Sequence, residues 1–163
     1  MFTLGEIVDL AVRIEKNGEM AYRKAQKEVS DASLADLLGR LADEEAEHEK
    51  WFLRFKEKVE PQKEDQRLEE MGKAVMQGVL GEQAFSVSEA DFSRIEDRDS
   101  LLALSVEFEK DTALFYEMLG AFIEDEKTLE QLDQIIQEEN RHIRLLNESL
   151  KNKTPLPSFK GPT

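Results

Sequence analysis

The sequence contains an internal repeat, because shifting the chain by 94 positions against itself aligns two separated segments without a gap. "VRIEKNGEMAY" (12–22) falls on "VEFEKDTALFY" (106–116), and "DEEAEH" (43–48) falls on "QEENRH" (137–142). Both segments of each copy have the apolar periodicity of helices, so each copy is predicted to be a helical hairpin. Two amphipathic hairpins that bury their apolar faces against each other make an all-α four-helix bundle.

The apolar periodicity also predicts where the helices begin and end. Residues with side-chain oxygens precede three of these segments and are expected to cap them. The expected caps are Thr3 in a capping box with Glu6, Asp31, and Thr128 in a capping box with Gln131. The expected helices span residues 4–28, 32–59, 100–122 and 129–152.

About forty residues separate the second helix from the third, which is too long for a hairpin turn and suits a crossover along a bundle. A shorter helix is expected within 65–83 and a loop over 84–99. The bundle domain is expected to span 1–152. The remaining residues, 153–163, contain three prolines and no periodicity, so an extended tail is expected there.

Ionisable side chains interrupt the apolar stripe of every long helix. Glutamate and histidine three residues apart lie on the same helix face, so each Glu-x-x-His can hold one ion. Four ionised carboxylates in a core would cost far more than the stability of a domain, about 5–15 kcal/mol, whereas two divalent cations would cancel their charge. The predicted metal ligands are Glu15, Glu45, His48, Glu109, Glu139 and His142. Such donors suit iron or manganese, and zinc remains open.

An isolated Glu-x-x-His on an acidic helix is common and seldom a metal site. Here the chain has two histidines in all, and both lie in this motif at equivalent positions of the repeat, which favours metal binding. Tyr22 lies seven residues after Glu15, and Tyr116 lies seven residues after Glu109. Each tyrosine is either a core aromatic or a hydrogen-bond donor to a ligand carboxylate.

Four further positions near the motif need an interpretation. Glu44 and Glu138 could orient the histidine of the opposite hairpin, although solvent exposure is the commoner situation for helix glutamates. Glu47 is expected on a solvated face, and Trp51 in ordinary packing.

Composition excludes several classes of function. The formal net charge of −14 argues against nucleic acid and anionic membranes as partners. The absence of cysteine excludes disulfides, thiolate metal sites and cysteine nucleophiles. No apolar run has the length of a membrane span, and the first residues lack the basic start of a signal peptide, so a cytoplasmic protein is expected.

At the motif residues, the sequence resembles the rubrerythrin branch of the ferritin-like superfamily over about residues 3–152. "EEAEH" and "EENRH", together with "EKNGEMAY" and "EKDTALFY", resemble its two half-repeats. The resemblance implies a four-helix bundle with a crossover, two iron ions held by the six residues above, and a homodimer. It also implies reduction of hydrogen peroxide or O₂ coupled to oxidation of Fe(II).

The sequence departs from that family in two respects. Rubrerythrins carry an additional glutamate one turn after the ligand of the third helix, where this chain has Thr112. They also carry a rubredoxin-like module with four cysteines, so this cysteine-free chain would need a separate electron donor such as rubredoxin. The remaining ligand set is similar to that of bacterioferritin. Two alternatives stay open: an iron-binding protein of the ferroxidase and storage type, and a di-manganese enzyme resembling catalase.

Overall fold

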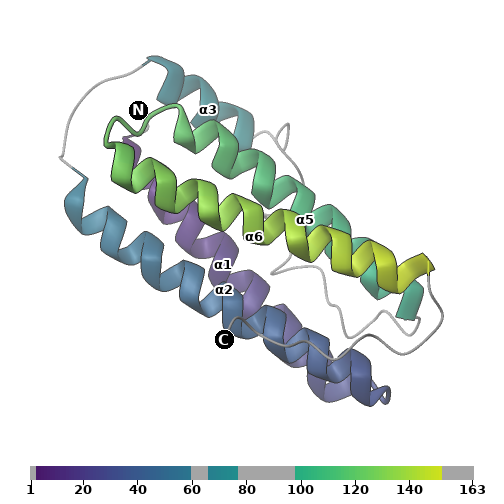
Figure 1. Ribbon diagram of the computed structural model, residues 1–163. Helices are drawn as coiled ribbons and strands as arrows, with labels where there is room; N and C mark the ends of the chain where they lie inside the picture. The colour runs from purple at the N-terminus through teal and green to yellow at the C-terminus, as the bar shows by residue number, and fades with distance from the viewer. Residues whose placement is uncertain (1–2, 60–65, 77–97, 152–163) are drawn as a thin grey trace.

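The structure is a computed structural model that describes residues 3–59, 66–76 and 98–151. All of its regular elements in these ranges are helices (Figure 1). They are α1 (Leu4–Glu28), α2 (Ala32–Lys58), α3 (Gln66–Met76), α5 (Arg98–Gly120) and α6 (Glu126–Lys151).

Two antiparallel hairpins, α1 with α2 and α5 with α6, pack against each other to form the predicted four-helix bundle (Figure 1). Helix α5 begins at the end of the bundle opposite to the end of α2, so their connection runs from one end to the other. Helix α3 lies within this connection and contacts α1. It adds Leu68 and Met71 to the core, while its Arg67 guanidinium lies 5.2 Å from the centre of the Phe122 ring.

The buried face of each helix is the stripe that the sequence predicts. In α2 it includes Leu34, Leu38, Leu41 and Phe52, all at most 2% exposed. Each such side chain contributes about 1.5–3 kcal/mol when it leaves water. The apolar layers lie toward both ends of the stripes, and the ionisable residues occupy the middle, so the core closes around the polar cluster.

Two of the predicted helix caps are confirmed. The Thr3 amide donates to Glu6 Oε2 at 2.7 Å, and the Glu6 amide donates to Thr3 Oγ1 at 3.2 Å, which is a capping box. Asp31 Oδ1 accepts from the amides of Ser33 and Leu34 at 2.9 and 3.2 Å. Both caps satisfy amide groups that have no partner within the first helical turn.

The predicted capping box at Thr128 is wrong, because α6 begins earlier, at Glu126. The Asp125 carboxylate accepts from the Thr128 amide at 2.8 Å and from the Thr128 hydroxyl at 2.6 Å. An ionised carboxylate is a stronger acceptor than a hydroxyl and is favoured at the positive end of the helix dipole, so Asp125 takes the capping position.

Other predicted boundaries shift by one or two residues, and α2 ends at Lys58 rather than 59. Helix α5 begins at Arg98, so the predicted loop over 84–99 is wrong at 98 and 99, and α5 ends at Gly120 rather than 122. The amides of Ala121 and Phe122 bond back to the carbonyls of Met118 and Leu119, which tightens the helix end. The rest of that loop, part of the short-helix range and the predicted tail at 153–163 lie outside the described residues. No helix in the described ranges combines the length and apolar character needed to cross a membrane.

Candidate metal centre

All six predicted ligand residues lie in the middle of the bundle core. Five of them are fully buried, and His48 is 3% exposed. Helices α1 and α5 each supply one glutamate, and α2 and α6 each supply one Glu-x-x-His pair. The helical period places these residues on the same stripes as the leucines and phenylalanines, so burying the apolar stripe also buries the polar groups.

The six residues form two groups, and in each group the potential ligand atoms lie within 4.8 Å of one another. Glu45 and Glu139 belong to both groups. Glu15 and His48 complete the first, and Glu109 and His142 complete the second. The arrangement therefore offers two adjacent candidate cation sites, each with one glutamate and one imidazole of its own, and two carboxylates that belong to both groups.

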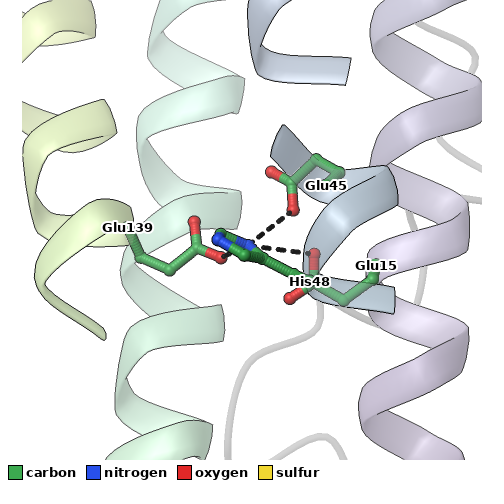
Figure 2. Close-up of side chains that lie close together, drawn as sticks. All are labelled: Glu15, Glu45, His48 and Glu139. Carbon is green, nitrogen blue, oxygen red and sulfur yellow. Dashed lines mark ion pairs between the residues drawn. The ribbon is translucent and has the colours of Figure 1, made fainter. Parts of the chain in front are cut away.

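Both imidazoles direct Nδ1 toward the carboxylates. His48 Nδ1 lies 2.9 Å from Glu139 Oε1, 3.7 Å from Glu15 Oε2 and 3.8 Å from Glu45 Oε2 (Figure 2). His142 Nδ1 lies 3.2 Å from Glu139 Oε2 and 3.7 Å from Glu109 Oε1. The two rings face each other with their centres 6.4 Å apart and their planes 25° from parallel.

The other imidazole nitrogen, Nε2, contacts a glutamate of the opposite hairpin. His48 Nε2 lies 2.7 Å from Glu138 Oε2, and His142 Nε2 contacts Glu44. The expectation that these glutamates are solvent-exposed is wrong, since their side chains are only 33% and 29% exposed. A carboxylate that accepts a hydrogen bond from Nε2–H favours the tautomer of the neutral ring whose Nδ1 lone pair can bind a cation.

Both tyrosines bond to glutamates of the opposite hairpin. The Tyr22 hydroxyl donates to Glu109 Oε1 at 2.6 Å, and the Tyr116 hydroxyl donates to Glu15 Oε1. Each bond occupies one carboxylate oxygen and leaves Oε2 of the same glutamate buried without a hydrogen bond. The sequence indicated a tyrosine near each glutamate, but the partner across the bundle follows only from the packing of the two hairpins.

Arg141 makes a contact in one half of the repeat that the sequence analysis did not predict. Arg141 Nη2 donates to both oxygens of Glu44 at 3.0 Å. The position equivalent to Arg141 in the first copy is Glu47, whose side chain is 69% exposed and pairs with Lys50 at 2.7 Å. The sequence could have revealed this difference, because the equivalent position is glutamate in the first copy and arginine in the second. Arg141 places a positive charge beside the Glu44–His142 pair.

Gly18 marks a second difference between the two halves of the repeat. A Cβ atom at Gly18 would lie 3.0 Å from Phe108 Cζ and 3.5 Å from Glu45 Cδ. The equivalent residue in the second copy is Thr112, which is buried and donates from Oγ1 to the Phe108 carbonyl at 2.9 Å. Gly18 therefore allows the Phe108 ring to approach α1 beside the cluster.

Without a cation, protons compensate the buried charges. Burial raises the pKa of Glu45 well above its usual range, and burial together with the Glu139 charge raises the pKa of Glu109 to about 8. Burial opposes charge on the imidazoles, but the surrounding carboxylates raise the pKa values of His48 and His142 well above the ordinary value. For Glu139, burial is outweighed by both imidazoles, which lower its pKa well below the usual range. Several of these groups therefore hold protons at neutral pH.

Comparison with known proteins identifies the family. The rubrerythrin family model matches residues 6–150. The chain belongs to the rubrerythrin family. A solved structure from Thermotoga maritima, described as a ferritin-like diiron-carboxylate protein, superposes with a TM-score of 0.66 at 19% identity, covering 94% of this chain and 97% of that one. The fold of the present rubrerythrin-family chain is therefore ferritin-like. No protein with a curated function matches the sequence.

The donor set of this rubrerythrin-family chain fits a pair of divalent cations. Among the described residues, eight buried side-chain atoms of the cluster make no hydrogen bond of good geometry, although some of them lie close to one another. Buried polar atoms without partners are rare and costly, unless an ion or water satisfies them. The atoms are Glu15 Oε2, both oxygens of Glu45, His48 Nδ1, Glu109 Oε2, both oxygens of Glu139 and His142 Nδ1.

Cation binding to this rubrerythrin-family cluster is expected to release protons, because a ligand must lose its proton before it binds a metal. Glu45, Glu109, His48 and His142 have raised pKa values in the metal-free state, so they give up protons as the cation enters. Affinity should consequently rise with pH up to about 8. Anaerobic calorimetric titration in buffers of different ionisation enthalpy measures the release. Binding heats that do not depend on the buffer would contradict the expected proton release.

Proposed function

We propose that the chain binds two iron ions between its hairpins and reduces hydrogen peroxide or O₂ while Fe(II) is oxidised. The observation that supports this proposal is the pair of ligand groups that share Glu45 and Glu139 within a rubrerythrin-family chain. Two adjacent cation sites allow two one-electron donors to act on one small oxidant. The hard carboxylate donors with one imidazole for each ion suit iron.

In this proposal, Glu15 and His48 hold one ion, and Glu109 and His142 hold the other. Glu45 and Glu139 belong to both groups and would be available to either ion. Bound ferrous ions would supply the electrons for this reduction. Tyr22 and Tyr116 keep the outer carboxylates in place through their hydrogen bonds, and Glu138 and Glu44 keep the imidazoles in place. The surrounding apolar layers limit the access of water.

A second candidate function is that of a ferroxidase that passes iron onward for storage. The structural observation behind it is Thr112, which occupies the position of the additional rubrerythrin glutamate and bonds to its own helix backbone. That position supplies no carboxylate to a metal ion. Iron content after exposure to excess Fe(II) separates the two functions. Two ions for each chain indicate a resident centre, and tens of ions indicate storage.

Under the proposed function, the reduced protein should complete one round of peroxide reduction and then stop. These 163 residues contain no cysteine, so none of them can form the four-cysteine iron site of a rubredoxin-like module that would return electrons to the centre. Addition of a separate donor, such as reduced rubredoxin, should restore turnover. Peroxide consumption is measured with and without the donor under anaerobic conditions.

Sustained peroxide loss without any donor would contradict this expectation and favour a di-manganese enzyme resembling catalase. Elemental analysis of protein isolated from its own host then decides between iron, manganese and zinc. Homodimer formation, expected from the family resemblance, remains a separate prediction that sedimentation analysis can test.

A further inference from the structure

Three aromatic side chains form a continuous path from the surface of α2 to the ligand carboxylate of Glu15. The ring centres of Trp51 and Phe52 are 5.0 Å apart, and those of Phe52 and Tyr116 are 4.8 Å apart. The Tyr116 hydroxyl then donates to Glu15 Oε1. Phe52 and Tyr116 are fully buried, whereas Trp51 is half-buried at the outer end of the path.

The repeat shows that packing alone does not require these rings. The positions equivalent to Trp51 and Phe52 in the second copy are Leu145 and Leu146. Leu146 is fully buried, so an aliphatic side chain fills the corresponding space in the other hairpin. The tyrosine is kept in both copies, but its aromatic extension along the neighbouring helix is present in only the first.

Trp51 is held in a defined orientation at the surface. Its indole stacks on Phe55, with ring centres 5.4 Å apart and planes 26° from parallel. Its Nε1 donates to Gln131 Oε1 of α6 at 3.0 Å. Tryptophan and tyrosine are the side chains whose rings lose a single electron most readily, and the chain contains one tryptophan and two tyrosines.

We propose that Trp51, Phe52 and Tyr116 are the route along which single electrons pass from an external donor to the metal centre. The inference rests on the proposed function for the acceptor at the inner end. Tyr116 gives one electron to the oxidised centre and its phenolic proton to Glu15. Trp51 then returns one electron to Tyr116, which recovers the proton from Glu15. A one-electron carrier protein that docks over Trp51, at the surface between α2 and α6, finally reduces the indole.

The route can be tested photochemically in the full-length chain without any metal. A photo-oxidised ruthenium complex in solution removes one electron from Trp51, and transient absorption follows the tryptophan and tyrosine radicals. In the unaltered protein, the tryptophan radical should decay as a tyrosine radical appears. The tyrosine signal should be lost in Tyr116→Phe and kept in Tyr22→Phe. These two variants are matched, since each removes one hydroxyl that bonds to a cluster glutamate.

Two further variants test the outer part of the route. Phe52→Leu and Trp51→Leu introduce the residues that the second copy already has at these positions, so both are expected to fold, which circular dichroism checks. Phe52→Leu should slow transfer from Trp51 to Tyr116, and Trp51→Leu should abolish early tyrosine oxidation. A tyrosine signal that persists in Tyr116→Phe, or unchanged transfer in Phe52→Leu, overturns the route. Because no metal takes part, either result leaves the proposed peroxide reduction standing, and a failed turnover assay leaves the route standing.

Discussion

Metal-loaded protein, with both sites filled, is expected to melt about 20 °C above the metal-free protein. A cation at about 1,000 times its Kd adds about 4 kcal/mol of stability for each site. Each kcal/mol moves the Tm of a domain of this size by about 2–4 °C. The physical source is the buried cluster, whose unpartnered oxygens and nitrogens would become ligands. Differential scanning calorimetry of the protein before and after anaerobic addition of Fe(II) measures the difference.

This difference in Tm should widen as the pH rises. The raised pKa of Glu109 stabilises the metal-free fold below its ordinary pKa, and that contribution is lost as the pH rises through about 8. The raised pKa values of His48 and His142 act in the same direction. Glu139 acts oppositely, since its lowered pKa contributes stability that is lost only in acid. If the metal-loaded and metal-free proteins had the same Tm at every pH, the cluster would not bind metal.

Loss of a carboxylate that faces both sites is expected to abolish tight binding of both ions. Glu45→Ala and Glu139→Ala should each weaken metal binding by more than about 100-fold. Losing a group that only supports a ligand costs up to about 100-fold, so losing the ligand itself should cost more. His48→Ala and His142→Ala should each weaken mainly one ion, because each imidazole belongs to one group. Anaerobic metal titration followed by elemental analysis measures the stoichiometry and affinity.

Glu47→Ala is the matched control for these variants. Glu47 lies between Glu45 and His48 in the sequence, but its side chain is 69% exposed and pairs with Lys50. It points away from the core, so its removal should leave metal content and affinity unchanged. A Glu47 variant as defective as the Glu45 variant, or full loading with two ions in either histidine variant, would refute the assignment of ligands.

Much of the fold follows from local patterns. The apolar periodicity predicted all four long helices, because a helix with one buried face has apolar residues at a period of about 3.6 in its sequence. The boundaries of α5 and α6 were predicted less accurately. At the start of α6, Asp125 competes with Thr128 for the same cap. That competition depends on where the preceding turn places each oxygen, which local sequence preference does not determine.

The sequence by itself determined the bundle and which six residues would be gathered within it, because the offset of 94 repeats both the stripes and the ionisable groups. The tertiary structure decided which atoms meet. Glu45 and Glu139 face both groups, Tyr22 bonds to Glu109 rather than to a residue of its own hairpin, and Glu138 bonds to His48. The partners in these two hydrogen bonds are 87 and 90 positions apart in the sequence, so they come together only when the hairpins pack. The relative rotation and offset of two packed helix pairs depend on how all their side chains interlock, and no single helical pattern contains that information.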